Sequence, residues 1–244
     1  MPDLGPLASA AALALLTVVL VWFAVGTQTN IRRGNRILSW MQEGLPLLGP
    51  RATLKWFGSS VAALRIVEPV APVREAEVLV VLEPRDLGAV WALLRSRGRR
   101  DFIVVRVNGM RAPRFRADLS DPRAWTARDR RADEEPPSVA ATAIGSGGPY
   151  ELRHDGDAPL EALGRAWEAL AAASAGTWRL SVRPTVPHVE VHLLPPSLAP
   201  APTRGRGGRG EPAVGSARLF SAVRELLRMA TAEPGAQAGP ARST

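Results

Sequence analysis

Residues 7–26 read LASAAALALLTVVLVWFAVG, twenty residues without a charged side chain. At a rise of about 1.5 Å per residue, a helix of this length crosses a hydrocarbon core of about 30 Å. The stretch therefore predicts a transmembrane helix. We assign residues 1–29 to an N-terminal anchor, which makes the rest of the chain a tethered domain.

The charges on either side of this stretch predict its orientation. No Lys or Arg precedes it, whereas Arg32, Arg33 and Arg36 follow shortly after its end. Because basic residues stay in the cytoplasm, we expect a single-pass protein of the inner membrane with its N-terminus outside and its domain inside. Trp22 and Phe23 fall where an aromatic belt meets the inner headgroups. The three arginines are expected at the same interface, close to anionic lipid.

A cleaved signal peptide is the competing interpretation of this stretch. Such a peptide has a basic first region, an apolar core of about 7–15 residues and a small-x-small cleavage site. Residues 24–26 fit a cleavage site, but the uncharged start and the greater apolar length favour an uncleaved anchor. Ala8 and Ala12 have the small-xxx-small spacing that lets two helices pack closely, so homo-oligomerisation through the span stays open.

Composition limits the chemistry of the remaining chain. There is no cysteine, which excludes structural disulfides and thiolate metal sites. The hydrophobic content of 46% is ordinary for a globular domain. The net charge is +8, and the positive excess lies in residues 27–150 and 195–244. Basic residues close to the span predict contact with an anionic leaflet, although they also serve simply to fix the topology.

Residues 30–50 predict a juxtamembrane amphipathic segment. Ile31, Leu38 and Met41 are near helical spacing, and Gly44 and Pro46 follow as stop signals. We expect a short helix that lies at the membrane surface.

The first α+β unit is expected over residues 51–119. It begins with two strand-like runs around Gly58, which indicate a β-hairpin. A buried strand, a helix that Asp86 can cap and Gly98 can end, and two more strands joined at Asn108–Gly109 follow. The expected strands are 52–57, 61–67, 76–82, 101–107 and 112–119.

The second α+β unit is expected over residues 150–194, again in the order β-α-β-β. Asp157 can cap its helix, whose apolar stripe consists of Leu160, Leu163, Trp167 and Leu170. The expected strands are 150–153, 178–182 and 188–194. Trp91 in the first helix corresponds to Trp167 in the second, which raises a duplication as a hypothesis. The fold class is therefore α+β.

The remaining segments are predicted from composition. Residues 120–149 read as a flexible loop, 195–215 as a Pro/Gly/Arg-rich linker and 232–244 as a disordered tail. Residues 216–231 predict an amphipathic helix whose stripe includes Leu219, Phe220 and Val223. This helix has three candidate positions: the membrane surface, a partner protein or its own domain.

Two pairs of polar residues are candidates for a ligand site. Glu83 and Arg85 follow one predicted strand, and His154 and Asp155 follow another, each just before a helix. Ligands of open α/β sheets gather at such carboxyl ends, although turn formation and helix capping also explain these residues.

Other polar motifs are weaker. His188, Glu190 and His192 alternate on one strand and share one face, where the histidines are too far apart for one metal ion, so we expect a solvated sheet face. Residues 205–210 spell G-x-G-x-x-G but follow no strand, which argues against a nucleotide site.

No catalytic residues, cofactor or metal site can be assembled from these motifs. We therefore expect an interaction module of scaffold or regulatory type at the inner membrane, with lipid and a protein as partners. One alternative is a membrane-tethered enzyme or small-ligand sensor with its site near residues 83–86 and 154–157. A second is a nucleic-acid-binding module that uses the basic region 85–131 and the arginine-rich tract at 204–209, although that tract is short.

Overall fold

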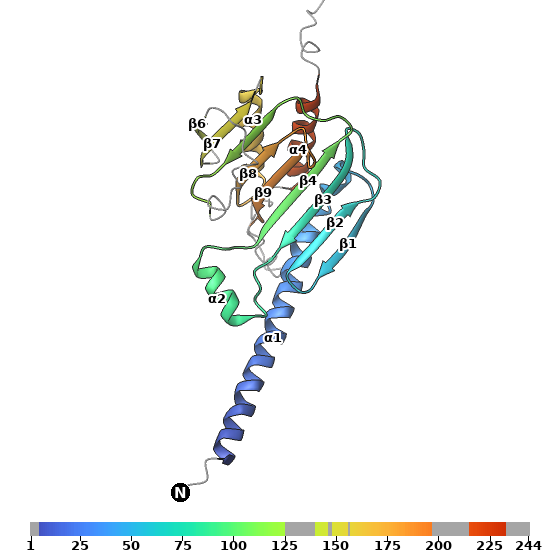
Figure 1. The fold of residues 1–244 in the computed structure, drawn as a ribbon. Coiled ribbons are helices and arrows are strands. Elements are labelled where there is room, and N and C mark those ends of the chain that lie inside the picture. Colours follow the sequence, from blue (N-terminus) through green and yellow to red (C-terminus); the bar gives the residue numbers. More distant parts are fainter. Residues whose placement is uncertain (1–4, 125–139, 146–147, 156, 197–214, 233–244) are drawn as a thin grey trace, which may run out of the picture.

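A computed structural model describes residues 5–124, 140–145, 148–155, 157–196 and 215–232 (Figure 1). It confirms the α+β class. A long N-terminal helix, α1 (Gly5–Met41), leads into an antiparallel sheet that carries the helices α3 (Leu160–Ala172) and α4 (Ser216–Thr231). The strands are β1 (Ala52–Phe57), β2 (Val61–Ile66), β3 (Val73–Val81), β4 (Phe102–Gly109), β5 (Arg116–Ser120), β6 (Ala140–Gly145), β7 (Gly148–Asp155), β8 (Gly176–Val182) and β9 (Val189–Leu194).

The nine strands form one sheet in the order β1-β2-β3-β4-β9-β8-β5-β7-β6. Every neighbouring pair is antiparallel. The direction of successive strands therefore alternates across the sheet. Because β3 and β7 run in opposite directions, the C-terminal end of β3 lies at one end of the strands and that of β7 at the other. This alternation decides which loops can meet.

The predicted span and the predicted juxtamembrane helix form one continuous helix, contrary to the expectation of two. α1 continues without a break through residues 27–41 and ends just before Gly44, as the stop signals predict. Ile37, Leu38 and Met41 are buried in the domain core and do not lie on a membrane surface. Leu38 and Met41 belong to the predicted stripe, whereas its third member, Ile31, is 37% exposed and Ile37 is buried in its place.

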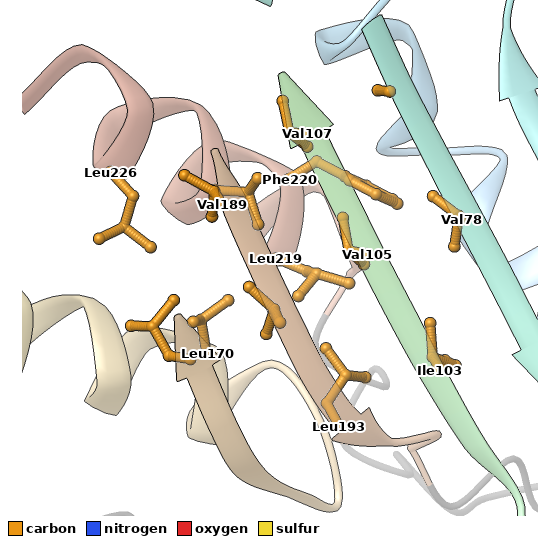
Figure 2. Close-up of a cluster of buried hydrophobic side chains, with 14 of the residues drawn as sticks. Val78, Ile103, Val105, Val107, Leu170, Val189, Leu193, Leu219, Phe220 and Leu226 are labelled. Atoms are coloured by element: carbon orange, nitrogen blue, oxygen red, sulfur yellow. The ribbon is translucent and has the colours of Figure 1, made fainter. Parts of the chain in front are cut away.

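One hydrophobic cluster joins α1, α3 and α4 to a single face of the sheet. Figure 2 shows its centre, where Phe220 and Leu219 of α4 lie against Val105 of β4 and Val189 of β9. Strand residues alternate between this covered face and the opposite face, so every second side chain of β3, β4 and β9 enters the core. The same core includes residues from both expected α+β units.

The elements follow the predicted β-α-β-β order, but the strand pairing differs from it. β4 and β5 are not neighbours: β4 lies between β3 and β9, and β5 lies between β8 and β7. Asn108 and Gly109 are the last residues of β4 and do not form a hairpin turn. A type I′ turn needs positive φ at both central residues, and Gly109 is not among the positive-φ glycines, whereas Gly58 in the confirmed β1–β2 hairpin has φ +64°.

Part of the segment that was predicted as a flexible loop forms a strand. Residues 140–145 form β6, within the stretch predicted as a flexible loop. The arginine-rich tract at 204–209 and the tail beyond residue 232 lie outside the described residues.

Helix α2 (Gly88–Ser96) departs most from the sequence pattern. It forms at the predicted place and Gly98, with φ +89°, follows its end, but none of its residues is buried. Asp86 does not cap it; the carboxylate accepts a hydrogen bond from the Ser59 hydroxyl at 2.7 Å. Asp157 likewise does not cap α3, whose N-cap residue is Pro159.

Helix α4 occupies the third of its candidate positions and packs on its own domain. All of its stripe residues are buried, including Leu226, Leu227 and Ala230. Its N-terminus is tied to the end of α1 by a 2.9 Å hydrogen bond from the Gly44 N–H to the Ser216 hydroxyl.

Candidate functional site at the junction of α1 and the sheet

A buried polar cluster joins α1 to the sheet just beyond the apolar stretch. We call it the junction cluster: Asn30, Arg33, Glu83, Arg85 and Asp101. It lies at the end of the sheet where β3 ends and β4 begins. Its members come from three separate parts of the sequence, and together they fix the helix to the domain.

Asn30 supplies the first connection. Its side chain is fully buried. The amide nitrogen donates to the Glu83 carbonyl at 3.0 Å and to the Ser60 hydroxyl at 3.3 Å, and the amide oxygen accepts from Arg85 Nη1 at 3.1 Å. One helical residue thus contacts both the β1–β2 turn and the segment after β3.

Asp101 is the centre of the cluster. Its carboxylate is 3% exposed and accepts a 2.7 Å hydrogen bond from the Glu83 N–H. Arg85 binds it through two nitrogens at 3.0 Å each, and Arg33 Nε forms a third ionic contact. Burial alone raises the pKa of this carboxyl, but the hydrogen bonds from Arg85 and Glu83 and the charges of Arg85 and Arg33 together bring it below its ordinary value.

Glu83 extends the cluster to α2. Its buried carboxylate accepts hydrogen bonds from Trp91 Nε1 at 2.5 Å and from Arg95 Nη1 at 3.2 Å, and Arg85 Nη2 lies 3.5 Å away. Both carboxylates of the cluster are therefore engaged by guanidinium groups. This arrangement suits a structural clamp, because hydrogen-bonded ion pairs to guanidinium groups hold the two carboxylates in a fixed geometry.

The apolar part of α1 also contacts the segment that leads into α2. Trp22 Nε1 donates to the Arg85 carbonyl at 3.0 Å, and the Trp22 and Trp91 rings are 6.3 Å apart. At Gly26 a Cβ atom would lie 2.3 Å from the Arg85 carbonyl oxygen, so only glycine permits this approach. Beside these contacts, an apolar groove of about 450 Å³ runs along α1 from Thr17 to Thr29.

The two predicted pairs of ligand residues are not brought together. Glu83 and Arg85 follow β3, whereas His154 and Asp155 end β7, and those two strands end at opposite edges of the sheet. Asp155 accepts a 2.6 Å hydrogen bond from the Arg116 N–H on β5. The carboxyl-end rule for parallel sheets does not apply to an antiparallel one.

The five residues expected at a membrane interface have different environments. Trp22 and Phe23 are about half exposed on α1, as a lipid contact requires. Arg32 and Arg36 are exposed on the continuing helix, and Arg33 is paired with Asp101.

The face of the sheet opposite α3 and α4 carries a second charged cluster. The Glu190 carboxylate contacts His192 Nε2 at 2.7 Å, Arg106 Nε at 3.2 Å and Arg183 Nη2 at 3.3 Å. His188 accepts a hydrogen bond from the Gly109 N–H at 3.0 Å. Because Glu190 and His188 are buried, the expectation of a solvated face was wrong for them.

Glu190 predicts a pH dependence of stability. Burial alone raises its pKa, but the His192 hydrogen bond and the charges of His192, Arg106 and Arg183 lower it from 4.5 to about 2. A carboxylate with a depressed folded-state pKa stabilises the fold above its unfolded pKa, and that contribution is lost as the pH falls. We expect the melting temperature to fall between pH 4.5 and pH 2, and less steeply in Glu190→Gln. Equal slopes for both proteins would contradict this assignment.

Sequence reasoning identified Glu83 and Arg85 but missed Asn30 and Asp101. A polar residue one turn beyond an apolar span, on the same helix, was the available signal for Asn30.

Among the described residues, no group of three or more His, Asp or Glu side chains is placed to hold a metal ion. Comparison with protein-family models and with curated proteins finds no match to this chain.

Proposed function

We propose that this chain is a single-pass inner-membrane protein whose cytoplasmic α+β domain is an interaction module of scaffold or regulatory type. Residues 7–26 form the span, and the domain is held against the inner leaflet. Protein partners approach a domain whose orientation to the bilayer is fixed by its own helix.

The continuity of α1 carries this proposal. One part of the helix is apolar and has no buried residue in its most apolar window, and an exposed apolar stretch that long is stable only when lipid or protein covers it. The other part lies in the domain core and is held by Asn30 and Arg33. A helix fastened in this way transmits position and rotation from the membrane to the domain, which suits a scaffold or a regulator.

The charge pattern supports the orientation. No basic residue precedes Gly26, whereas Arg32, Arg33 and Arg36 follow it on the same helix. Arg32 and Arg36 are exposed and remain available to the inner leaflet.

Labelling of single cysteines in intact cells tests the topology, because the chain has no native cysteine. We expect a membrane-impermeant thiol reagent to label full-length Pro2→Cys in intact cells and Ala112→Cys only after permeabilisation. Ala112 is exposed and lies in the β4–β5 connection, at the sheet edge farthest from the junction cluster. Labelling of Ala112→Cys in intact cells would place the domain outside and overturn the proposal.

A catalytic assay tests the interaction role. The purified full-length protein is assayed for turnover of a substrate. If it had such an activity, and if His154→Ala or Asp155→Ala abolished it, the enzyme alternative would replace the proposal. We expect neither substitution to affect the association of the protein with partners that crosslink to the domain in membranes.

A further inference from the structure

Helix α2 exposes an apolar face that no described part of the domain buries. Val90 and Leu93 are three residues apart on the helix and are 44% and 51% exposed, and Leu87, just before the helix, is 52% exposed. Trp91 and Leu94 are only partly exposed, and the Trp91 indole donates to Glu83 of the junction cluster. The helix is therefore attached through one side and leaves an apolar side open.

Helix α2 lies beside the apolar part of α1. Trp22 contacts both Arg85, just before α2, and Trp91 within it. Figure 1 shows α2 beside α1, beyond the sheet edge at which the apolar part of α1 leaves the domain. The groove between α1 and α2 continues as far as Thr17, within the apolar stretch.

The charges near α2 complete the pattern of an interfacial helix. Arg95, Arg97, Arg99 and Arg100 cluster at its C-terminal end. Arg97 and Arg100 are exposed. Helices that lie in a membrane interface combine one apolar face with arginine or lysine close to the headgroups.

We infer that α2 is a second membrane-contacting element, embedded at the boundary between headgroups and acyl chains of the cytoplasmic leaflet. Leu87, Val90 and Leu93 contact acyl chains, and the arginine cluster faces anionic phosphate groups. This inference rests on the proposed function, because it requires α1 to span the bilayer.

Lipid fits this surface better than a second protein does. Helix α2 lies next to the apolar part of α1, and the groove between them is lined almost entirely by apolar side chains of α1 together with Trp91, a surface that acyl chains can fill. The positive charge at its rim complements an anionic leaflet. With two contacts, α1 and α2, the domain has one tilt and one rotation relative to the bilayer.

The test uses full-length protein reconstituted in vesicles of phosphatidylcholine and phosphatidylglycerol. Four single-cysteine variants carry an environment-sensitive fluorophore: Val90→Cys, Leu93→Cys, Leu16→Cys in the span and Ala112→Cys on the far side of the domain. Quenching is measured with brominated phospholipids and, separately, with aqueous iodide. The two α2 positions guard against a local effect of either label.

We expect brominated lipid to quench the labels at positions 16, 90 and 93 and to leave the label at 112 unchanged. If brominated lipid quenched the label at 16 but not the labels at 90 and 93, this inference would be overturned. The proposed function would still stand. Protection of 90 and 93 from iodide without quenching by lipid would assign the face to a protein. A label at 16 that lipid does not quench would overturn both proposals.

Discussion

Asp101→Ala is expected to lower the free energy of unfolding of the domain by about 3 kcal/mol, the low end for breaking a buried ion pair, because Arg33 is partly exposed and Arg85 keeps Glu83 as a partner. Arg85 would lose its bidentate acceptor, and Arg33 would lose the contact that joins α1 to the residue just before β4. The Glu83 N–H would also lose its acceptor. Denaturant unfolding of full-length protein in micelles, followed by tryptophan fluorescence, measures the change.

An exposed ion pair provides the matched control for this substitution. Arg51 and Glu68 are 2.9 Å apart and both largely exposed. Glu68→Ala should therefore cost no more than about 1 kcal/mol. If Asp101→Ala cost no more than Glu68→Ala, the junction cluster would not be what fastens the helix to the sheet.

Phe220→Ala is expected to lower the free energy of unfolding by about 3–5 kcal/mol through loss of burial and the cavity left behind. Phe220 is fully buried between the sheet and the end of α1, where its ring packs close to Gly44. The same denaturant experiment measures the effect.

The result also distinguishes the three positions predicted for α4. Ser221 is the neighbouring residue on the exposed side of the helix, and Ser221→Ala should change stability by no more than about 0.5 kcal/mol. If Phe220→Ala were as well tolerated, α4 would dock on a membrane or a partner and would not belong to the core.

Elements with a strong local signal were predicted well from sequence. The β1–β2 hairpin depends on Gly58 and two short strands around it, and the structure has both. The apolar stripe of α4 and the buried residues Leu163, Trp167 and Leu170 of α3 follow helical spacing. The spacing of apolar residues along a helix identifies its buried side when the helix packs on a single surface, as α3 and α4 pack on the sheet.

Strand pairing could not be predicted, because it depends on contacts between distant residues. β5 lies between β7 and β8, although β4 precedes it in the chain. Asn108–Gly109 looked like a turn because the dipeptide favours one. In the fold, Asn108 pairs instead with Glu75 of β3 and accepts a hydrogen bond from the His188 N–H.

The candidate site was predicted only in part, for a related reason. Placing Glu83 and Arg85 near His154 and Asp155 assumed strands that end at one edge, and the antiparallel sheet separates them. Leu87, Val90 and Leu94 follow helical spacing, which predicts a buried stripe, but no residue of α2 is buried in the domain. Spacing alone cannot distinguish a sheet from a membrane.

The rigid connection between span and domain is the central claim, and a distance distribution tests it most directly. Spin labels on Leu16→Cys and Ala112→Cys, in one full-length chain reconstituted in nanodiscs, report the distance from the middle of the span to the far end of the domain. We expect a single narrow distribution, because α1 is continuous and Asn30 and Arg33 fasten it to the sheet. A broad distribution, or two separate distances, would show a hinge after the span and contradict the account.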